Sequence, residues 1–266
     1  RDNGLDWYDY GARMYDASIG RWHVVDPMSE KYYTWSPYMY CIGNPNNAID
    51  LQGKLVIFIN GFHTGSGGTS TYWEGFDNRV VNFLNDNNRM YIDGSLGGYN
   101  TLKNNSRIMN ADYRRDNGYT RGMMEASSIV QMISDDNGNI KETVKILTHS
   151  MGASYAKGYV QALKEYFIDN NIPLSNIAFE MDFAPFQPTK QSAVEGIDTY
   201  QVTNLYDDVA NSRLLGSPYG YIKGATVYLN NDMRKGHSII DFLDDIWRLP
   251  NGNYRVDING NIIRTE

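Results

Sequence analysis

The chain has 266 residues with 24 Lys and Arg against 31 Asp and Glu, which gives a formal net charge of -7. Its length and its 41% hydrophobic content suffice for one sizeable core, while the acidic balance disfavours a nucleic-acid partner, which would need a basic surface. The single cysteine, Cys41, allows no disulfide within the chain. Four histidines without Cys-x-x-C spacing indicate no zinc site, and nothing in the sequence predicts a cofactor.

No run of about 18 apolar residues predicts a membrane span, and the N-terminal stretch RDNGLDWYDYGARM lacks the apolar core of a signal peptide. We therefore expect either a cytoplasmic protein or a piece of a larger chain that is exported by another route. The absence of an initiating Met favours the piece.

Residues 1–53 are rich in Tyr, Trp, Gly, Asp and Pro, which predicts short strands and turns without a sustained helix. The motifs YDYGARMYD, IGRWHVVDP and SPYMYCIGNPNNAID closely resemble the RHS repeat-associated core sequence. That resemblance implies a large preceding shell of YD repeats and a variable toxin domain after the core, often released by self-cleavage. The family usually ends this core with Asp-Pro-x-Gly, whereas Asp50-Leu51-Gln52-Gly53 has no proline, so we do not predict self-cleavage at this junction.

From Lys54 onward, apolar runs alternate with helical periods. We predict strands at 54–62, 89–95, 143–148, 176–183, 199–206 and 225–230, helices at 72–86, 119–136, 152–171 and 237–249, and an Asn-Gly hairpin at 254–266. The first helix is amphipathic and turns inward Trp73, Phe76, Val80, Val81 and either Phe83 or Leu84. Continuous apolar strands between helices predict an α/β fold, a mostly parallel sheet with helices on both faces. We expect two units, 1–53 and 54–266.

Ser150 lies between the apolar run VKILT and a helical stretch that begins at Gly152. Catalytic groups gather at the carboxyl ends of parallel strands, and a nucleophile elbow places its serine on the tight turn from such a strand into a helix. The elbow needs small residues two positions before and after the serine, which Gly152 supplies and Thr148 does not. The alternative is that Ser150 is a helix N-cap. The stretch HSMGA resembles the elbow of lipases and other α/β hydrolases.

A serine hydrolase also needs a histidine base, and the chain offers four candidates. His23 lies in the first 53 residues, His63 follows the first strand, and His149 adjoins Ser150 but would point away from it. His237 follows the last predicted strand of the sheet and opens the last helix, where α/β hydrolases place this base. Taken alone, His237 has the alternative reading of a helix-start histidine without chemistry.

The third member must be a carboxylate that orients the imidazole, on a loop between the serine and the histidine. The stretch VTNLYDDVAN resembles the N-x-x-D-x-V end of the corresponding strand in many lipases, and that register selects Asp207. Asp208 is the reserve, and Asp182, one strand earlier, is a second contender. The alternative for each is an ordinary turn aspartate.

An oxyanion needs two backbone N–H donors, one after the nucleophile and one from the loop after an earlier strand. Met151 supplies the first. The glycine-rich stretch INGFHTGSGG resembles the HGF oxyanion turn of lipases with Asn60 in place of the histidine, so Phe62 is the second donor and Gly61 permits the turn. A phosphate-binding loop is the competing interpretation, but neither G-K-[ST] nor G-x-G-x-x-G follows the strand.

These residues predict a serine hydrolase that cleaves an ester, with lipid as the preferred substrate. Two alternatives are a hydrolase fold that has lost activity and serves as a binding module, which Thr148 and Asn60 favour, and a peptidase or thioesterase on the same fold. Joined to an RHS-like core, a lipase-like domain implies a secreted antibacterial toxin. Such a toxin would be delivered to a competitor cell as part of a larger chain, attack its membrane lipids and have a cognate immunity protein.

Overall fold

The computed structural model describes residues 7–9, 14–16, 18, 19, 21, 22, 24, 55–65, 67–84, 86, 88–95, 110–135, 137–211, 219–248, 254–256 and 262–264. Near the N-terminus, β1 (Trp7–Asp9), β2 (Met14–Asp16) and β3 (Arg21–Trp22) form an antiparallel sheet, as the prediction of short strands required. Near the C-terminus, β10 (Tyr254–Val256) pairs antiparallel with β11 (Ile262–Arg264), in agreement with the predicted hairpin. The junction 50–53 and Cys41 lie outside the described residues, and the division at residue 53 stays a prediction.

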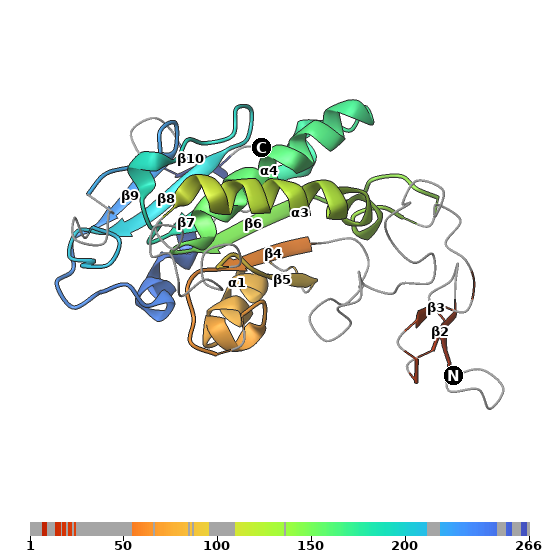
Figure 1. The fold of residues 1–266 in the computed structure, drawn as a ribbon, viewed down its shortest axis with the longest axis horizontal. Helices are drawn as coiled ribbons and strands as arrows, with labels where there is room; N and C mark the ends of the chain where they lie inside the picture. The colour runs from red at the N-terminus through yellow and green to blue at the C-terminus, as the bar shows by residue number, and fades with distance from the viewer. Residues whose placement is uncertain are drawn as a thin grey trace.

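A six-stranded parallel sheet forms the centre of the molecule, with the order β5-β4-β6-β7-β8-β9 (Figure 1). Its strands are β4 (Leu55–Asn60), β5 (Arg89–Asp93), β6 (Val144–His149), β7 (Ile177–Phe183), β8 (Thr199–Asn204) and β9 (Thr226–Asn230). All six predicted strands are thus confirmed. Because every strand runs the same way, the loops after all six meet at one edge of the sheet.

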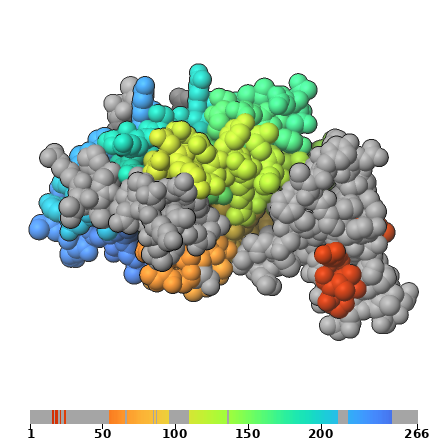
Figure 2. Space-filling view, in the orientation of Figure 1, coloured from red at the N-terminus to blue at the C-terminus, as the bar shows by residue number. Residues whose placement is uncertain are grey.

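Helices cover both faces of this sheet, as the sequence pattern predicted. On one face, α3 (Ala111–Met132) and α4 (Gly152–Asp169) pack over Leu55, Ile57 and Ile59 of β4. On the other face, α1 (Phe76–Leu84) and the 3-10 helix η6 (Ile239–Arg248) pack over Val56 and Phe58. The alternation of β4 side chains between two apolar cores explains why the strand is a continuous apolar run. In Figure 2, α3 (yellow-green) lies at the front of the molecule, α4 (green) is visible behind it at the upper right, and α1 (orange) lies along the lower edge.

The first predicted helix is shorter than expected. A 3-10 turn, η3 (Ser70–Trp73), is separated from α1 by Glu74 and Gly75, whose φ angles of 49° and 87° are left-handed and end the turn. Trp73, Phe76, Val80, Val81 and Leu84 are buried, whereas Phe83 is exposed, so Leu84 is the inward residue of the pair left open.

The second predicted helix, 119–136, begins too late, because α3 starts at Ala111 with Asn110 as its N-cap. Its polar first turns hide the helical period, and Gly118 resembles a breaker. In the fold Gly118 permits a close crossing with α4, since a Cβ there would lie 1.9 Å from the carbonyl oxygen of Tyr155. The last helix, expected from residue 237, begins at Ile239 and is wound as 3-10 turns rather than as α-helix.

None of the helices among the described residues is both long enough and apolar enough to span a membrane.

Candidate active site

Ser150 occupies the turn between β6 and α4 with a φ of 56°, a left-handed conformation that is uncommon outside glycine. Its backbone N–H donates to Phe183 O at 3.0 Å, and its carbonyl accepts from the N–H groups of Phe186 at 3.0 Å and Ala153 at 3.3 Å. These bonds hold a conformation that costs about 1–3 kcal/mol. The alternative reading of Ser150 as N-cap is wrong, because α4 has Met151 as its N-cap and no side-chain cap bond.

The close packing that this turn needs comes from glycines on both sides of it. A Cβ at Gly61 would lie 2.6 Å from the Ser150 Cβ, and one at Gly152 would lie 2.3 Å from Ile59 O, so neither position accepts a side chain without a shift. Thr148, the residue that breaks the usual pattern, is accommodated because its hydroxyl turns toward β7 and donates to Asp182 Oδ1 at 2.6 Å. The turn therefore forms without a small residue at position 148.

The side chains of Ser150, His237 and Asp207 meet at the carboxyl edge of the sheet. His237 Nε2 lies 2.8 Å from Ser150 Oγ, and His237 Nδ1 lies 2.8 Å from Asp207 Oδ2. The other oxygen of Asp207 accepts from the backbone N–H groups of Val209 at 2.9 Å and Ala210 at 2.8 Å. An ionised carboxylate so held makes Nδ1 the protonated nitrogen of His237, which leaves Nε2 to accept the serine proton.

The two other aspartates considered from the sequence lie elsewhere. Asp208 is exposed on the surface. Asp182 is fully buried but is bonded to Thr148 and, at 2.5 Å, to the Lys157 ammonium. The register N-x-x-D therefore selected the aspartate that contacts His237.

Sequence reasoning missed Asn204, which closes β8 and is fully buried. Its side-chain amide donates to the carbonyl oxygens of Asp232, at 3.2 Å, and Lys235, in the loop that carries His237. The backbone carbonyl oxygen of Asn204 accepts from the Asp207 N–H at 3.2 Å. Asn204 thus ties the acid loop to the histidine loop, and the asparagine of the N-x-x-D match was the one sign of it in the sequence.

The predicted oxyanion donors flank the same turn. Met151 stands at the start of α4, where backbone N–H groups have no partner within the helix. Phe62 follows Gly61, which lies directly against Ser150, and both Phe62 and Met151 line the cavity at the serine. Asn60, in place of the family's histidine, bonds within its own loop: its Oδ1 accepts from Gly68 N at 2.7 Å and its Nδ2 donates to Gly61 O at 2.8 Å.

Two further histidines lie close to the serine without contacting it. His63 Nε2 is 3.0 Å from Asp93 Oδ2, a carboxylate whose other oxygen accepts from Ser95 and Asn60. The ring of His149 points away from the Ser150 hydroxyl, as expected, and bonds to the carbonyl of His237 at 2.7 Å. Burial first, and then the neighbouring His237, lower the pKa of His149 to about 3.

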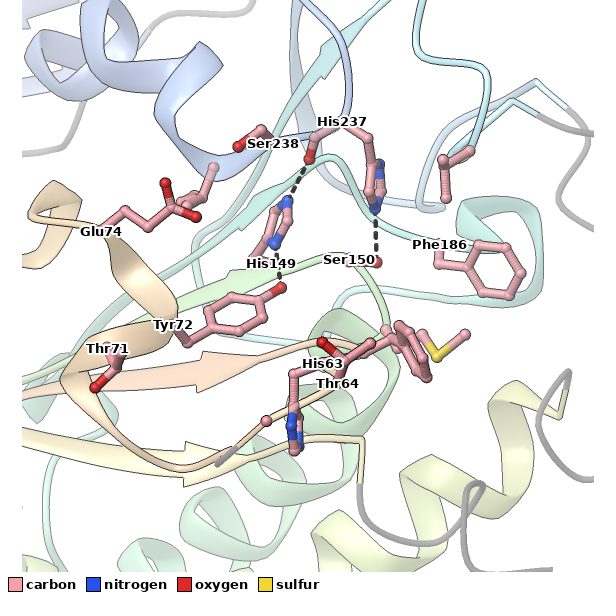
Figure 3. Close-up of a pocket in the computed structure, with 15 residues that line it drawn as sticks. His63, Thr64, Thr71, Tyr72, Glu74, His149, Ser150, Phe186, His237 and Ser238 are labelled. Carbon is pink, nitrogen blue, oxygen red and sulfur yellow. Dashed lines mark hydrogen bonds between the residues drawn. The ribbon is translucent and has the colours of Figure 1, made fainter. Parts of the chain in front are cut away.

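A cavity of about 710 Å³ opens at Ser150. Figure 3 places Phe186 on one side of the serine, and Tyr72, Glu74 and Ser238 on the other. The apolar side chains that line this cavity include those of Phe62, Met151, Phe186, Val209 and Ile239. Within the described part of the chain, no group of three or more His, Cys, Asp or Glu side chains is arranged to hold a metal ion.

No protein-family model matches the chain. A stretch of 58 residues, 22% of the chain, is 40% identical to salivary gland surface protein 1 of Aedes aegypti and spans 2% of that protein's length.

The chain also has similar solved structures. A Xanthomonas campestris protein named as a hydrolase of the alpha/beta superfamily aligns at a TM-score of 0.43 and 13% identity, over 73% of this chain and 94% of that one. A serine hydrolase without a lid from the same organism aligns at 0.40 and 13%, over 75% and 82%. An esterase domain from Rhodothermus marinus aligns at 0.37 and 9%, over 75% and 85%. Likeness at this level says nothing of catalysis or substrate.

Proposed function

We propose that the chain is a serine hydrolase that cleaves esters through an acyl-enzyme. The observation that carries this proposal is the continuous contact from Ser150 Oγ to His237 and on to Asp207, with both hydrogen bonds at 2.8 Å. A serine is a poor nucleophile unless a base takes its proton, and a buried carboxylate stabilises the imidazolium that results. Three residues from three separate loops meet here, with the histidine between the serine and the aspartate as this chemistry needs.

In the first step, His237 Nε2 takes the proton of Ser150 as its Oγ attacks the ester carbonyl. The oxyanion lies against the N–H groups of Met151 and Phe62, and His237 returns the proton to the departing alcohol. A water molecule then gives a proton to His237 as its oxygen attacks the acyl-enzyme carbonyl. His237 returns that proton to Ser150 Oγ as the bond from Oγ to the acyl carbon breaks and the carboxylic acid leaves.

The lining of the cavity supports an apolar acyl group. Phe62, Met151, Phe186, Val209 and Ile239 line the cavity that opens at the serine, and an acyl chain that leaves water for such side chains gains about 0.8 kcal/mol per buried CH₂. We therefore propose a lipid ester as the substrate.

A serine-directed experiment tests the reaction. We expect wild type to hydrolyse a short-chain p-nitrophenyl ester and phospholipid vesicles, and to be labelled by a fluorophosphonate. Ser150→Ala and His237→Ala lose hydrolysis of both substrates, and Ser150→Ala also loses the label. Ser154→Ala is the matched control, because Ser154 lies in α4 four residues after Ser150, is buried, and has a hydroxyl with no hydrogen-bond partner among the described residues.

Undiminished hydrolysis by Ser150→Ala would overturn the proposal. An unlabelled, inactive wild type would favour a binding module instead. Cleavage of peptides or thioesters in preference to lipid esters would retain the mechanism and replace the substrate.

We extend the proposal to the setting of the reaction. The resemblance of residues 1–53 to an RHS core supports a role as the C-terminal effector of a larger secreted protein, which reaches a competitor cell and meets an immunity protein in the producer. Production of the chain inside a bacterial host, with and without an added export signal, tests this role. We expect growth arrest with release of free fatty acids, both absent for Ser150→Ala; normal growth in both compartments would contradict the effector role.

A further inference from the structure

A second chain of hydrogen bonds runs beside the serine, and it involves groups that the proposed reaction does not use. The Gly61 N–H donates to Tyr72 Oη at 3.3 Å, Tyr72 Oη bonds to His149 Nδ1, and His149 Nε2 lies 2.7 Å from the carbonyl oxygen of His237. Figure 3 shows Tyr72, His149 and His237 in this sequence, with Ser150 to one side. The chain joins the loop that carries Phe62 to the loop that carries the base.

Each bond in this chain has one possible direction. The carbonyl of His237 can only accept, so His149 Nε2 carries the proton and His149 Nδ1 is the acceptor. Tyr72 must then donate its hydroxyl proton to Nδ1, which leaves its oxygen to accept from the Gly61 N–H. Burial raises the pKa of Tyr72, so its hydroxyl keeps that proton.

The main chain at His237 needs such support, because it lies between β9 and η6 and belongs to neither. Its neighbours are held by side chains: Asn204 donates to the carbonyls of Asp232 and Lys235, and Asp241 accepts from the Gly236 N–H at 2.9 Å. His149 supplies the equivalent donor for the carbonyl of His237 itself. Asp207 fixes the ring of His237, and His149 fixes the backbone from which that ring extends.

We propose that His149, held in one tautomer by the carbonyl of His237 and bonded to Tyr72 through Nδ1, is a positioning residue that couples the oxyanion loop to the catalytic base. This role rests on the proposed function of Ser150 and His237. His149 touches no reacting atom and acts through the backbone of the base. A displacement of about 1 Å in such a group can cost about 100-fold in rate.

A matched pair of variants separates the two bonds of His149. In His149→Gln the side-chain amide nitrogen takes the place of Nε2, so the donor to His237 is kept and the acceptor for Tyr72 is lost. In His149→Asn the side-chain oxygen takes the place of Nδ1, so the acceptor is kept and the donor to His237 is lost. Both side chains are polar and smaller than or similar to histidine, so overpacking does not enter.

We expect His149→Asn to lower kcat for a p-nitrophenyl ester by about 10- to 100-fold with KM changed by less than about twofold. The lost donor displaces His237, which acts in the chemical step and not in substrate binding. His149→Gln should recover to within about threefold of wild type, which is the value of one net hydrogen bond. Fluorophosphonate labelling rates should follow the same order. Equal kcat for the two variants, or a loss confined to KM, would overturn the coupling.

Imidazole ¹H–¹⁵N spectra test the contacts without turnover, and so separate a failure of this inference from a failure of the proposed function. We expect a single Nε2–H tautomer for His149 from pH 5 to 8, and a shifted Nδ1–H resonance of His237 in His149→Asn but not in His149→Gln. Tyr72→Phe should keep the Nε2–H tautomer, because the carbonyl of His237 still accepts from it, and should shift the resonance of His149 Nδ1, which loses its donor. An Nδ1–H tautomer in wild type, or an unchanged His237 resonance in His149→Asn, would overturn the inference even in an active enzyme.

Discussion

Two fully buried aspartates lie near the carboxyl ends of neighbouring strands, Asp182 within β7 and Asp207 after β8, and they have different partners. Asp207 is held by two backbone N–H groups and faces a histidine, whereas Asp182 is bonded to the Lys157 ammonium and the Thr148 hydroxyl. An ammonium neutralises its carboxylate permanently, so Asp182 cannot stabilise a charge that develops during a reaction. Position at a strand end is therefore insufficient to identify a catalytic acid, and the partner decides.

The cluster around Asp182 extends to Glu180, whose Oε1 accepts from Lys157 at 2.7 Å. Burial raises the pKa of Glu180 to about 8, although the lysine opposes this shift. One ammonium thus contacts two carboxyl groups, those of Glu180 and Asp182. Four experiments sharpen or break the comparison between the serine site and this lysine cluster, which we define as Lys157, Glu180, Asp182 and Thr148.

The largest effect is expected for Asp207→Asn, which should lower kcat by about 10³- to 10⁴-fold, because an amide cannot fix the required tautomer of His237. Steady-state kinetics with a p-nitrophenyl ester measures it. Asp182→Asn is the control, and its folded fraction should keep kcat within about threefold of wild type. A larger loss in Asp182→Asn than in Asp207→Asn would reverse the assignment.

Lys157→Met should act on stability rather than on turnover. It leaves buried carboxylate charge without a partner, which should lower the free energy of unfolding in urea by about 3–5 kcal/mol. The triple variant Lys157→Met, Glu180→Asn and Asp182→Asn removes the charge as well as the partner and should recover most of this loss. If the triple variant were as unstable as the single one, packing rather than charge would hold the cluster together.

Because of His149 in the serine site, the free energy of unfolding of the chain should decrease as the pH falls. The pKa of His149 is about 3 in the folded chain against a usual 6.5, so between these values only the unfolded chain binds the proton. The free energy of unfolding should therefore rise with pH up to 6.5, by at most about 1.4 kcal/mol per pH unit. Urea unfolding from pH 4.5 to 6.5 measures this slope in wild type and in His149→Gln. The free energy of unfolding should rise less steeply with pH in His149→Gln than in wild type, and identical slopes would refute the lowered pKa of His149.

The lysine cluster should respond in the opposite direction. The pKa of Glu180 is raised to about 8 from a usual 4.5, so its contribution to stability is complete below pH 4.5 and is lost as the pH rises through 8. Between pH 6.5 and 8.5 we expect wild type to lose at most about 1.4 kcal/mol per pH unit and Glu180→Gln to lose less. Parallel pH curves for the two proteins would show that Glu180 is ionised in the folded chain.

Much of this molecule could be predicted from local sequence. Six apolar runs separated by helical periods identified all six parallel strands, because a strand buried on both faces needs apolar side chains throughout. The same rule located the loops after those strands, and with them Ser150, Asp207 and His237. Local patterns failed where helices begin with polar turns, as at Ala111, and where a glycine serves a helix crossing rather than a turn, as at Gly118.

The tertiary structure alone decided which polar groups meet. His149 bonds to Tyr72 and to the carbonyl of His237 across 77 and 88 residues of chain, and Asp182 contacts Lys157 across 25. Strand ends that are distant in sequence share one edge of a parallel sheet, so a local motif can name the candidates for a site but not their partners. Chain order and the N-x-x-D register pointed to Ser150, His237 and Asp207, and only the packing of loops at that edge decided which groups hold the backbone of His237 in place.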